Sequence, residues 1–282
     1  MNKRQIDVSV ISDLHLATHA CKPKKVLEYL KSIHTDLLIL NGDIIDSWRF
    51  SRNYFPKNHL KVIRQLIKMM EKGTRVIYIT GNHDEFLRKF SGTKVGLLEI
   101  ANQFIFEAGG TKTWIFHGDV FDEIIHRSKR LAKFGAALYG LLTLLNKLLN
   151  WLLLPFGKKE IIIYKSLKKN FVREKSTTSK FESQLGQSAV VQGYNSVICG
   201  HTHLPKFKML DIDGTPVQYI NCGDWVEHLT AAEFYNGEWH LYEHNHMDEE
   251  NQADETDIPA EQFIYQTLLK ELTFSNLIEA RP

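Results

Sequence analysis

The feature that most constrains the fold of this chain is a repeated pairing of a short apolar run with a block of metal-ligating residues. Five such runs, rich in Val, Ile or aromatic residues, are typical of buried strands: Ile6–Ile11, Leu37–Leu40, Val76–Ile79, Trp114–Phe116 and Val197–Cys199. The blocks that follow them are Asp13-x-His15, Gly42-Asp43, Gly81-Asn82-His83-Asp84, His117-Gly118-Asp119 and Gly200-His201-Thr202-His203. Ligands at the carboxyl ends of neighbouring strands can converge on one crevice, so the five blocks together predict a two-metal site.

Length and composition limit the classes of protein to consider. The 282 residues allow one large α/β domain or a domain with an insertion, and 43% hydrophobic with 24% charged residues is ordinary for a soluble globular protein. A net charge of +2 argues against a nucleic-acid partner. The three cysteines lack a C-x-x-C spacing, which favours buried, reduced thiols. Residues 1–5 run directly into the first predicted strand without a signal peptide, so we expect a cytoplasmic protein.

The predicted elements change character along the chain. Up to about Val120, strands alternate with helical patterns such as Lys24–Ile33 and Leu60–Lys72, which predicts βαβ units and a largely parallel sheet. Gly73 is placed to end the second helix. After Val197, short strands joined by turns such as Asn236-Gly237 predict antiparallel pairing. We therefore expect two sheets packed face to face with helices outside, formed by residues 1–120 and 194–246.

Residues 121–193 form a predicted helical insertion, a lid next to the site. Its middle, 134–156, is almost entirely apolar, and the exceptions lie on one narrow helical stripe. The length would permit a membrane span, but the motifs on both sides must meet at one site, which excludes a single crossing. A buried helix pair, a homodimer interface and a lipid-facing surface remain open; flanking lysines and Arg130 favour contact with anionic lipid. Residues 247–282 are predicted to be an acidic linker and a short C-terminal helix.

The residue types in the five blocks point to phosphoryl chemistry. Two divalent cations about 3.5–4 Å apart can hold both the attacking and the leaving oxygen. Asp43 is the natural bridging carboxylate because it follows the flexible Gly42. Mixed imidazole, carboxylate and amide ligands favour Mn²⁺, with Fe or Zn²⁺ as alternatives. His83 can donate to a phosphate oxygen or protonate the leaving group, with Asp46 or Asp84 orienting its ring.

The order of the motifs resembles the calcineurin-like metallophosphoesterases over roughly residues 6–245. The sequences of Gly42 to Trp48 and of Gly200 to Pro205, together with the insertion, resemble the branch around UDP-2,3-diacylglucosamine pyrophosphatase of the lipid A pathway. The resemblance implies a four-layer α/β/β/α sandwich of two mixed sheets with a helical insertion. It implies one metal held by Asp13, His15, Asp43 and His203, and a second held by Asp43, Asn82, His117 and His201.

The resemblance also implies a substrate and its surroundings. That substrate is a UDP-linked acylated sugar, cleaved at its pyrophosphate by metal-activated water to give UMP and a lipid sugar phosphate, at the surface of the inner membrane. The candidate substrate contacts are Asn82, His83, Asp122, His126, Arg127, Lys165 and Lys169. His83 departs from the pattern of the lipid A enzymes, which carry arginine at this place in the motif (G-N-R-D). Histidine is the commoner residue here in the wider superfamily.

Two other functions stay open. The chain could be a phosphodiesterase or phosphatase for a soluble nucleotide or sugar phosphate, with the apolar stripe used for packing or dimerisation. It could also be a non-catalytic scaffold of the same fold that docks partners through the insertion. The full set of ligands, with His83 added, argues against the scaffold.

Overall fold

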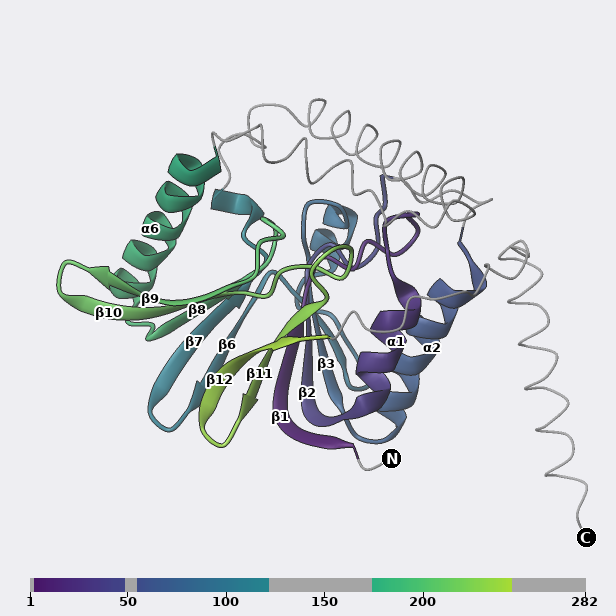
Figure 1. The fold of residues 1–282 in the computed structure, drawn as a ribbon. Helices are drawn as coiled ribbons and strands as arrows, with labels where there is room; N and C mark the ends of the chain where they lie inside the picture. Colours follow the sequence, from purple (N-terminus) through teal and green to yellow (C-terminus); the bar gives the residue numbers. More distant parts are fainter. Residues whose placement is uncertain (1–2, 49–54, 122–173, 245–282) are drawn as a thin grey trace, which may run out of the picture.

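Two mixed β-sheets lie face to face at the centre of the molecule (Figure 1). The computed structural model describes residues 3–48, 55–121 and 174–244, without the side chains of 174–180. The first sheet has the order β12-β11-β1-β2-β3-β5-β4 and the second β6-β7-β8-β10-β9. In chain order the strands are β1 (Arg4–Ile11), β2 (Ile33–Asn41), β3 (Arg75–Ile79), β4 (Lys94–Val95), β5 (Leu98–Ala101), β6 (Gln103–Ala108), β7 (Thr111–Phe116), β8 (Ser196–Cys199), β9 (Lys206–Ile212), β10 (Thr215–Asn221), β11 (Thr230–Tyr235) and β12 (Glu238–Glu243).

Strand direction follows the sequence pattern except in two places. β1, β2, β3 and β5 pair in parallel, and β11 and β12 add an antiparallel edge through the predicted turn at Asn236-Gly237. The expectation of a largely parallel arrangement up to Val120 is wrong for two antiparallel hairpins, β4–β5 in the first sheet and β6–β7 in the second. For β6–β7 the physical reason is Gly109-Gly110, where both residues adopt positive φ and allow a two-residue turn.

Helices cover the outer faces of both sheets (Figure 1). Helix α1 (Pro23–Ser32) and helix α2 (Lys57–Glu71) pack on the first sheet, and helix α6 (Glu174–Gln192) packs on the second. Two short 3₁₀ helices, η1 (Glu85–Phe90) and η2 (Asp119–Phe121), follow two of the motifs. Gly73 ends α2 as predicted: its φ is +99°, and its N–H donates to the Met70 carbonyl at 2.9 Å.

The apolar core has three parts that match these layers. One lies between the first sheet and its helices, and one between the sheets, where Val10, Ile39 and Ile198 are completely buried. The third lies between the second sheet and α6, which contributes Leu185 and Ala189. These cores confirm the predicted α/β/β/α arrangement. Helix α6 falls within the predicted insertion 121–193; residues 122–173 and 245–282 lie outside the described residues, so the domain boundaries stay a prediction.

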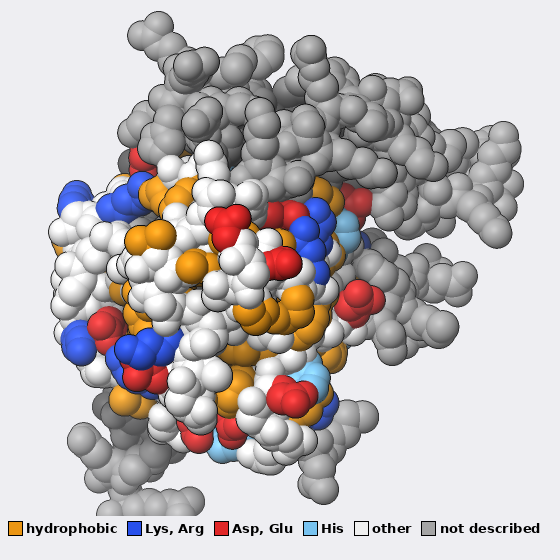
Figure 2. Space-filling view, turned by 90° about the vertical axis from the view of Figure 1, so that its left-hand side faces the viewer, with side chains coloured by type: hydrophobic (Ala, Val, Ile, Leu, Met, Phe, Trp, Pro, Cys, Tyr) orange, Lys and Arg blue, Asp and Glu red, His pale blue; other side chains and the backbone are white. Residues whose placement is uncertain are grey.

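The side of the molecule that carries α6 shows basic and acidic side chains interspersed with hydrophobic ones (Figure 2). No broad area of a single charge covers the described atoms of this face. None of the helices in the described ranges is both long and apolar enough to cross a membrane.

Candidate metal centre

The five motifs lie in loops at the carboxyl ends of β1, β2 and β3 in the first sheet and of β7 and β8 in the second. Backbone hydrogen bonds join neighbouring loops: the Asp13 N–H donates to the Gly42 carbonyl at 3.1 Å, and the His15 N–H to the Asp43 carbonyl at 2.9 Å. A bond between the sheets joins the His201 N–H to Asp13 Oδ2 at 3.0 Å. The loops therefore form one connected frame rather than five separate turns.

Most of the candidate ligands have an unusual backbone conformation. Nine non-glycine residues in the described parts of the chain have positive φ, and five are predicted metal ligands: Asp13, His15, Asp43, His201 and His203. Each such residue costs of order 1–3 kcal/mol, and such residues cluster where function requires them. The chain thus tolerates strain at the positions that aim these side chains inward.

Three side chains form a first group of ligand atoms. One ligand atom each from Asp13, His15 and His203 lies within 4.8 Å of the others. His203 Nε2 is 3.3 Å from Asp13 Oδ1 and 3.4 Å from His15 Nε2. Asp43 Oδ2 borders this group at 4.0 Å from His15 Nε2. These are the four residues predicted for the first metal.

A second group contains Asp43, His117 and His201, whose ligand atoms also lie within 4.8 Å of one another. His117 Nε2 is 3.3 Å from Asp43 Oδ2. Asp43 Oδ1 already accepts the His83 N–H at 2.8 Å, which leaves Oδ2 to face both groups. Asp43 Oδ2 therefore lies close to ligand atoms of both groups, and its role as a bridging carboxylate stays a prediction.

Unsatisfied buried atoms show that these groups fit cations. Asp13 Oδ1, Asn82 Oδ1 and His117 Nε2 are buried and have no hydrogen-bond partner among the described atoms. His117 Nδ1 lies 2.9 Å from the Asn41 carbonyl, which only accepts, so Nδ1 carries a proton and Nε2, 3.3 Å from Asp43 Oδ2, is the nitrogen left for a metal. Buried oxygen and nitrogen atoms that can only accept, and that have no hydrogen-bond donor, need a positive charge beside them, such as a metal ion. The residues present therefore suit divalent metals.

Electrostatics lead to the same conclusion. Burial would lower the pKa values of His117 and His203, but nearby carboxylates outweigh it. Asp43 raises the pKa of His117 well above its usual value, and Asp13 with Asp224 raises the pKa of His203 to about 9. Burial would raise the pKa of Asp43, yet the neighbouring imidazoles, His117 first, hold it well below its usual value. The pocket attracts positive charge, which protons supply when metal is absent.

His83 is not part of the second group, but with His15 and Asp43 it forms a third set of ligand atoms within 4.8 Å of one another. Its Nδ1–H donates to Asp46 Oδ2 at 2.9 Å, and its ring lies 4.1 Å from the Trp48 ring between centroids. Burial would lower the pKa of His83, but Asp43 and Asp46 together raise it. The ring is thus oriented and favoured in its charged form, as a proton donor requires.

Asp84, the other candidate for orienting His83, contacts different groups. It is completely buried and accepts hydrogen bonds from the Tyr78 hydroxyl at 2.7 Å, the Gly81 N–H at 2.6 Å and the Ile44 N–H at 2.9 Å. Burial and the nearby Asp43 charge raise its pKa. Asp46 is the carboxylate on the His83 ring, whereas Asp84 joins the loops after β2 and β3.

Two groups that hold the imidazoles of His117 and His203 were not predicted from the sequence. One is the Asn41 carbonyl behind His117, and no side-chain pattern could reveal a backbone acceptor. The other is Asp224, whose Oδ2 lies 2.8 Å from His203 Nδ1. A usable signal existed for Asp224: it follows Gly223 just after β10, as Asp43 follows Gly42 just after β2.

The substrate-contact candidates divide into two sets. His83 lies beside Asp43 and donates its N–H to Oδ1, and Asn82 precedes it in the loop after β3 with a buried, unpartnered Oδ1. The remaining candidates lie outside the described residues, and their roles stay predictions: Asp122, His126, Arg127, Lys165 and Lys169.

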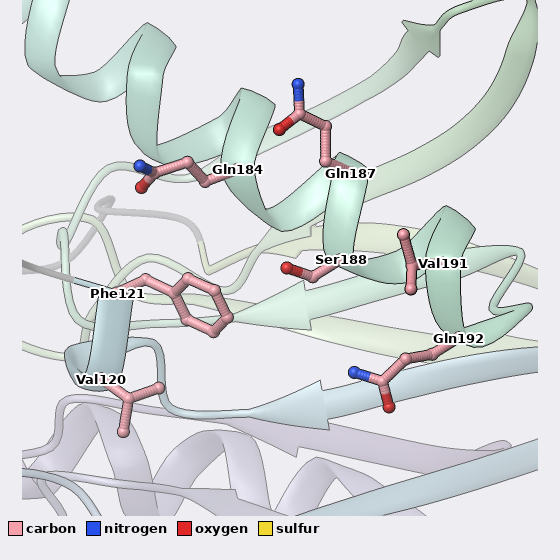
Figure 3. A pocket seen from close by; sticks show the side chains of 7 residues that line it. All are labelled: Val120, Phe121, Gln184, Gln187, Ser188, Val191 and Gln192. Atoms are coloured by element: carbon pink, nitrogen blue, oxygen red, sulfur yellow. The ribbon is translucent and has the colours of Figure 1, made fainter.

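A separate cavity of about 500 Å³ lies between η2 and α6 (Figure 3). Val120 and Phe121 of η2 line one side, and the ring of Phe121 points toward α6. The α6 side chains that line it are Gln184, Gln187, Ser188, Val191 and Gln192. None of these groups is ionisable and none is a candidate metal ligand. The lining that the described residues contribute therefore provides neutral contacts only.

Comparisons with known proteins identify a family and several relatives. Residues 6–205 match the pattern of the calcineurin-like phosphoesterases. The UDP-2,3-diacylglucosamine hydrolase of Aeromonas hydrophila is 24% identical over 248 residues, covering 83% of this chain and 97% of that protein. The UDP-2,3-diacylglucosamine hydrolase of Chromohalobacter salexigens is 26% identical over 231 residues, covering 77% of this chain and 87% of that protein. A solved phosphoesterase from E. coli aligns with a TM-score of 0.40 at 17% identity, covering 81% of this chain and 88% of that one.

Proposed function

Because the chain belongs to the calcineurin-like phosphoesterase family, we propose that it hydrolyses the pyrophosphate bond of a UDP-linked acylated sugar such as UDP-2,3-diacylglucosamine. The chain is a metal-dependent phosphoester hydrolase that uses divalent metal. The products of the proposed reaction are UMP and a lipid sugar phosphate. The observation that carries the reaction type is the single carboxylate oxygen, Asp43 Oδ2, that faces two groups of ligand atoms.

The proposal includes two metal ions, with Mn²⁺ as the preferred metal and Fe or Zn²⁺ as alternatives. Asp13, His15 and His203 would hold one ion, Asn82, His117 and His201 the other, and Asp43 both. When bound, such a pair polarises the phosphate and activates a water molecule for attack. Imidazoles or an amide beside carboxylates in each group support a transition metal over Ca²⁺ or Mg²⁺.

The protein's own groups perform the remaining tasks. His83, charged and oriented by Asp46, would donate a proton to the leaving phosphate oxygen or a hydrogen bond to the phosphate. Trp48 limits the positions open to the His83 ring by packing against it. Asp84 keeps the loops after β2 and β3 at a fixed separation, and so keeps Asp43 and His83 together.

The substrate assignment is supported by the relatives. Several proteins that cover most of this chain carry the name UDP-2,3-diacylglucosamine hydrolase, at about a quarter identity. The deciding assay incubates purified protein and Mn²⁺ with UDP-2,3-diacylglucosamine in detergent and measures UMP. We expect UMP release that depends on the metal. Absence of UMP with Mn²⁺, Fe²⁺ and Zn²⁺ alike would reject this substrate.

His83 favours a second candidate function, a phosphodiesterase or phosphatase for a soluble nucleotide or sugar phosphate. An imidazole that donates a proton needs only a leaving oxygen on the substrate and does not require acyl chains. The two candidates differ in their response to lipid. Activity on UDP-diacylglucosamine that rises in mixed micelles supports the first, and equal or greater turnover of a soluble UDP-sugar supports the second.

The proposed substrate also suggests a location and partners. We expect the enzyme in the cytoplasm, peripheral to the inner membrane, with a nucleotide-sugar lipid as its ligand, no nucleic acid as a partner, and a homodimer through the insertion as a further possibility. Sedimentation with anionic vesicles tests the membrane contact, and light scattering tests the dimer. A protein that stays in the supernatant at low salt contradicts the membrane contact.

A further inference from the structure

A buried carboxylate stands behind His203, on the far side of its ring from the other ligands. Asp224 is 2% exposed, and its Oδ2 lies 2.8 Å from His203 Nδ1. The other ring nitrogen, Nε2, faces Asp13 Oδ1 at 3.3 Å and the first group of ligand atoms. The imidazole is therefore held between two carboxylates, one on each nitrogen.

The Asp224 carboxylate is itself fixed by its second oxygen. Asp224 Oδ1 accepts the backbone N–H groups of Glu227 and His228 at 2.8 Å each, and that of Val226 at 3.3 Å. These bonds hold the turn that follows β10. The two oxygens thus have separate tasks: Oδ1 holds the turn, and Oδ2 contacts the imidazole.

We propose that Asp224 is a positioning residue that fixes His203 with its proton on Nδ1 and so presents the Nε2 lone pair to the metal. A carboxylate only accepts hydrogen bonds, so the nitrogen that faces it must be the donor. Outer carboxylates of this kind orient histidine ligands and increase their basicity. The inference rests on the metal centre of the proposed function but is independent of which ester is cleaved.

The decisive variant is Asp224→Asn, because it separates the two oxygens. The amide oxygen can still accept the three backbone N–H groups, while the amide NH₂ then faces His203 Nδ1. That nitrogen must now accept, so the proton moves to Nε2 and blocks the lone pair. We expect Mn²⁺ affinity at the first group to fall by about 10–100-fold in titration calorimetry without substrate. The metal-free variant should keep the wild-type circular dichroism spectrum but melt at a lower temperature below about pH 9, because it loses a carboxylate that favours charged His203.

Two controls separate positioning from a general loss of structure. Glu233→Gln removes another buried carboxylate, one that accepts from Arg4 and Tyr29 in the first sheet, and should leave both metal affinities unchanged. In a His203→Ala background, Asp224→Asn should cause no further loss of affinity. Equal losses in both backgrounds, or full affinity in Asp224→Asn, would overturn the inference and leave the metal centre intact. A wild-type protein that binds no Mn²⁺ would overturn both.

A measurement on the wild type avoids the question of whether a variant folds. Long-range ¹H–¹⁵N correlation spectra of the Zn²⁺-loaded protein report which His203 nitrogen carries the proton. We expect a protonated Nδ1 and a metal-bound Nε2. A protonated Nε2 would refute the role of Asp224.

Discussion

At the scale of the single residue, Asp43 and His83 have different tasks although they are hydrogen-bonded neighbours. The His83 N–H fixes one oxygen of Asp43, and the other oxygen lies between the two groups of ligand atoms. The His83 ring instead turns toward Asp46 and Trp48. Substitutions at the two positions should therefore affect metal content and turnover in different ways.

Asp43→Ala should lose both metals and all measurable turnover, because it removes the ligand that both groups share. Metal analysis of the purified variant after Mn²⁺ loading and desalting provides the measurement. His83→Ala is the matched comparison, since it removes a neighbouring side chain and should keep both ions. Equal metal loss in the two variants would contradict this division of tasks between Asp43 and His83.

His83→Ala should slow turnover by roughly 10²–10⁴-fold if the ring protonates the leaving group. The slowing should be much smaller with a p-nitrophenyl phosphoester, whose leaving group departs without a proton. Values of kcat for a UDP-sugar and for the p-nitrophenyl ester test this. The same slowing on both substrates would point to phosphate binding rather than proton donation.

At the scale of the structural element, the strand ends determine where the ligands lie, and glycines leave room for them. Gly42 adopts a φ of +82°, and a Cβ at this position would overlap the ring of His117. Gly110 in the β6–β7 turn has a similar φ of +78°, but a Cβ there would meet no atom within 4 Å. The two positions share the backbone constraint and differ only in the surrounding space.

Gly110→Ala should therefore cost about 1–2 kcal/mol of unfolding free energy, the backbone penalty alone. Gly42→Ala should cost more and should also weaken Mn²⁺ binding, because the His117 ring must shift. Urea unfolding of the metal-free proteins, combined with calorimetric Mn²⁺ titrations, provides both quantities. Indistinguishable results for the two variants would show that the close approach at Gly42 is unimportant.

The elements that could be predicted from the sequence are those with strong local patterns. The five apolar runs became β1, β2, β3, β7 and β8, and the Asn236-Gly237 turn joins β11 to β12. The short strands β4 and β5 and the strand β6 were missed, because their residues are exposed or half-buried and show no clear alternation. Their places depend on pairing with distant strands, which a local pattern does not contain.

The candidate site was more predictable than the fold around it. Ligand types after strands are visible in the sequence, and the structure brings together Asp13, His15, Asp43, His117, His201 and His203, while Asn82 has a buried, unpartnered Oδ1. The groups behind the ligands were less visible. The choice between Asp46 and Asp84 as the partner of His83 required side-chain geometry, and the Asn41 carbonyl required the fold itself.

At the scale of the whole molecule, the buried charges of the centre couple stability to pH and to metal. The pKa of His203 is raised from 6.5 to about 9 in the folded protein. A raised pKa stabilises the fold fully below the unfolded value and loses that effect as pH rises through the folded value. Metal replaces the protons, so it should remove most of this dependence.

We therefore expect the melting temperature of chelator-treated protein to fall between pH 6.5 and about 9, the unfolded and folded pKa values of His203. With excess Mn²⁺ the melting temperature should be higher throughout, since the metal binds only the folded chain, and the fall with pH should be smaller. Differential scanning fluorimetry at matched ionic strength measures both. A melting temperature unaffected by either chelator or Mn²⁺ would contradict the coupling.

The central claim is that two cations share the Asp43 carboxylate at one site, at the carboxyl ends of strands from both sheets. Anomalous diffraction at the manganese edge, from crystals grown with Mn²⁺, tests it most directly. We predict two anomalous peaks about 3.5–4 Å apart, one beside Asp13, His15 and His203 and the other beside Asn82, His117 and His201. A single peak, or none in this pocket at saturating Mn²⁺, would contradict the claim.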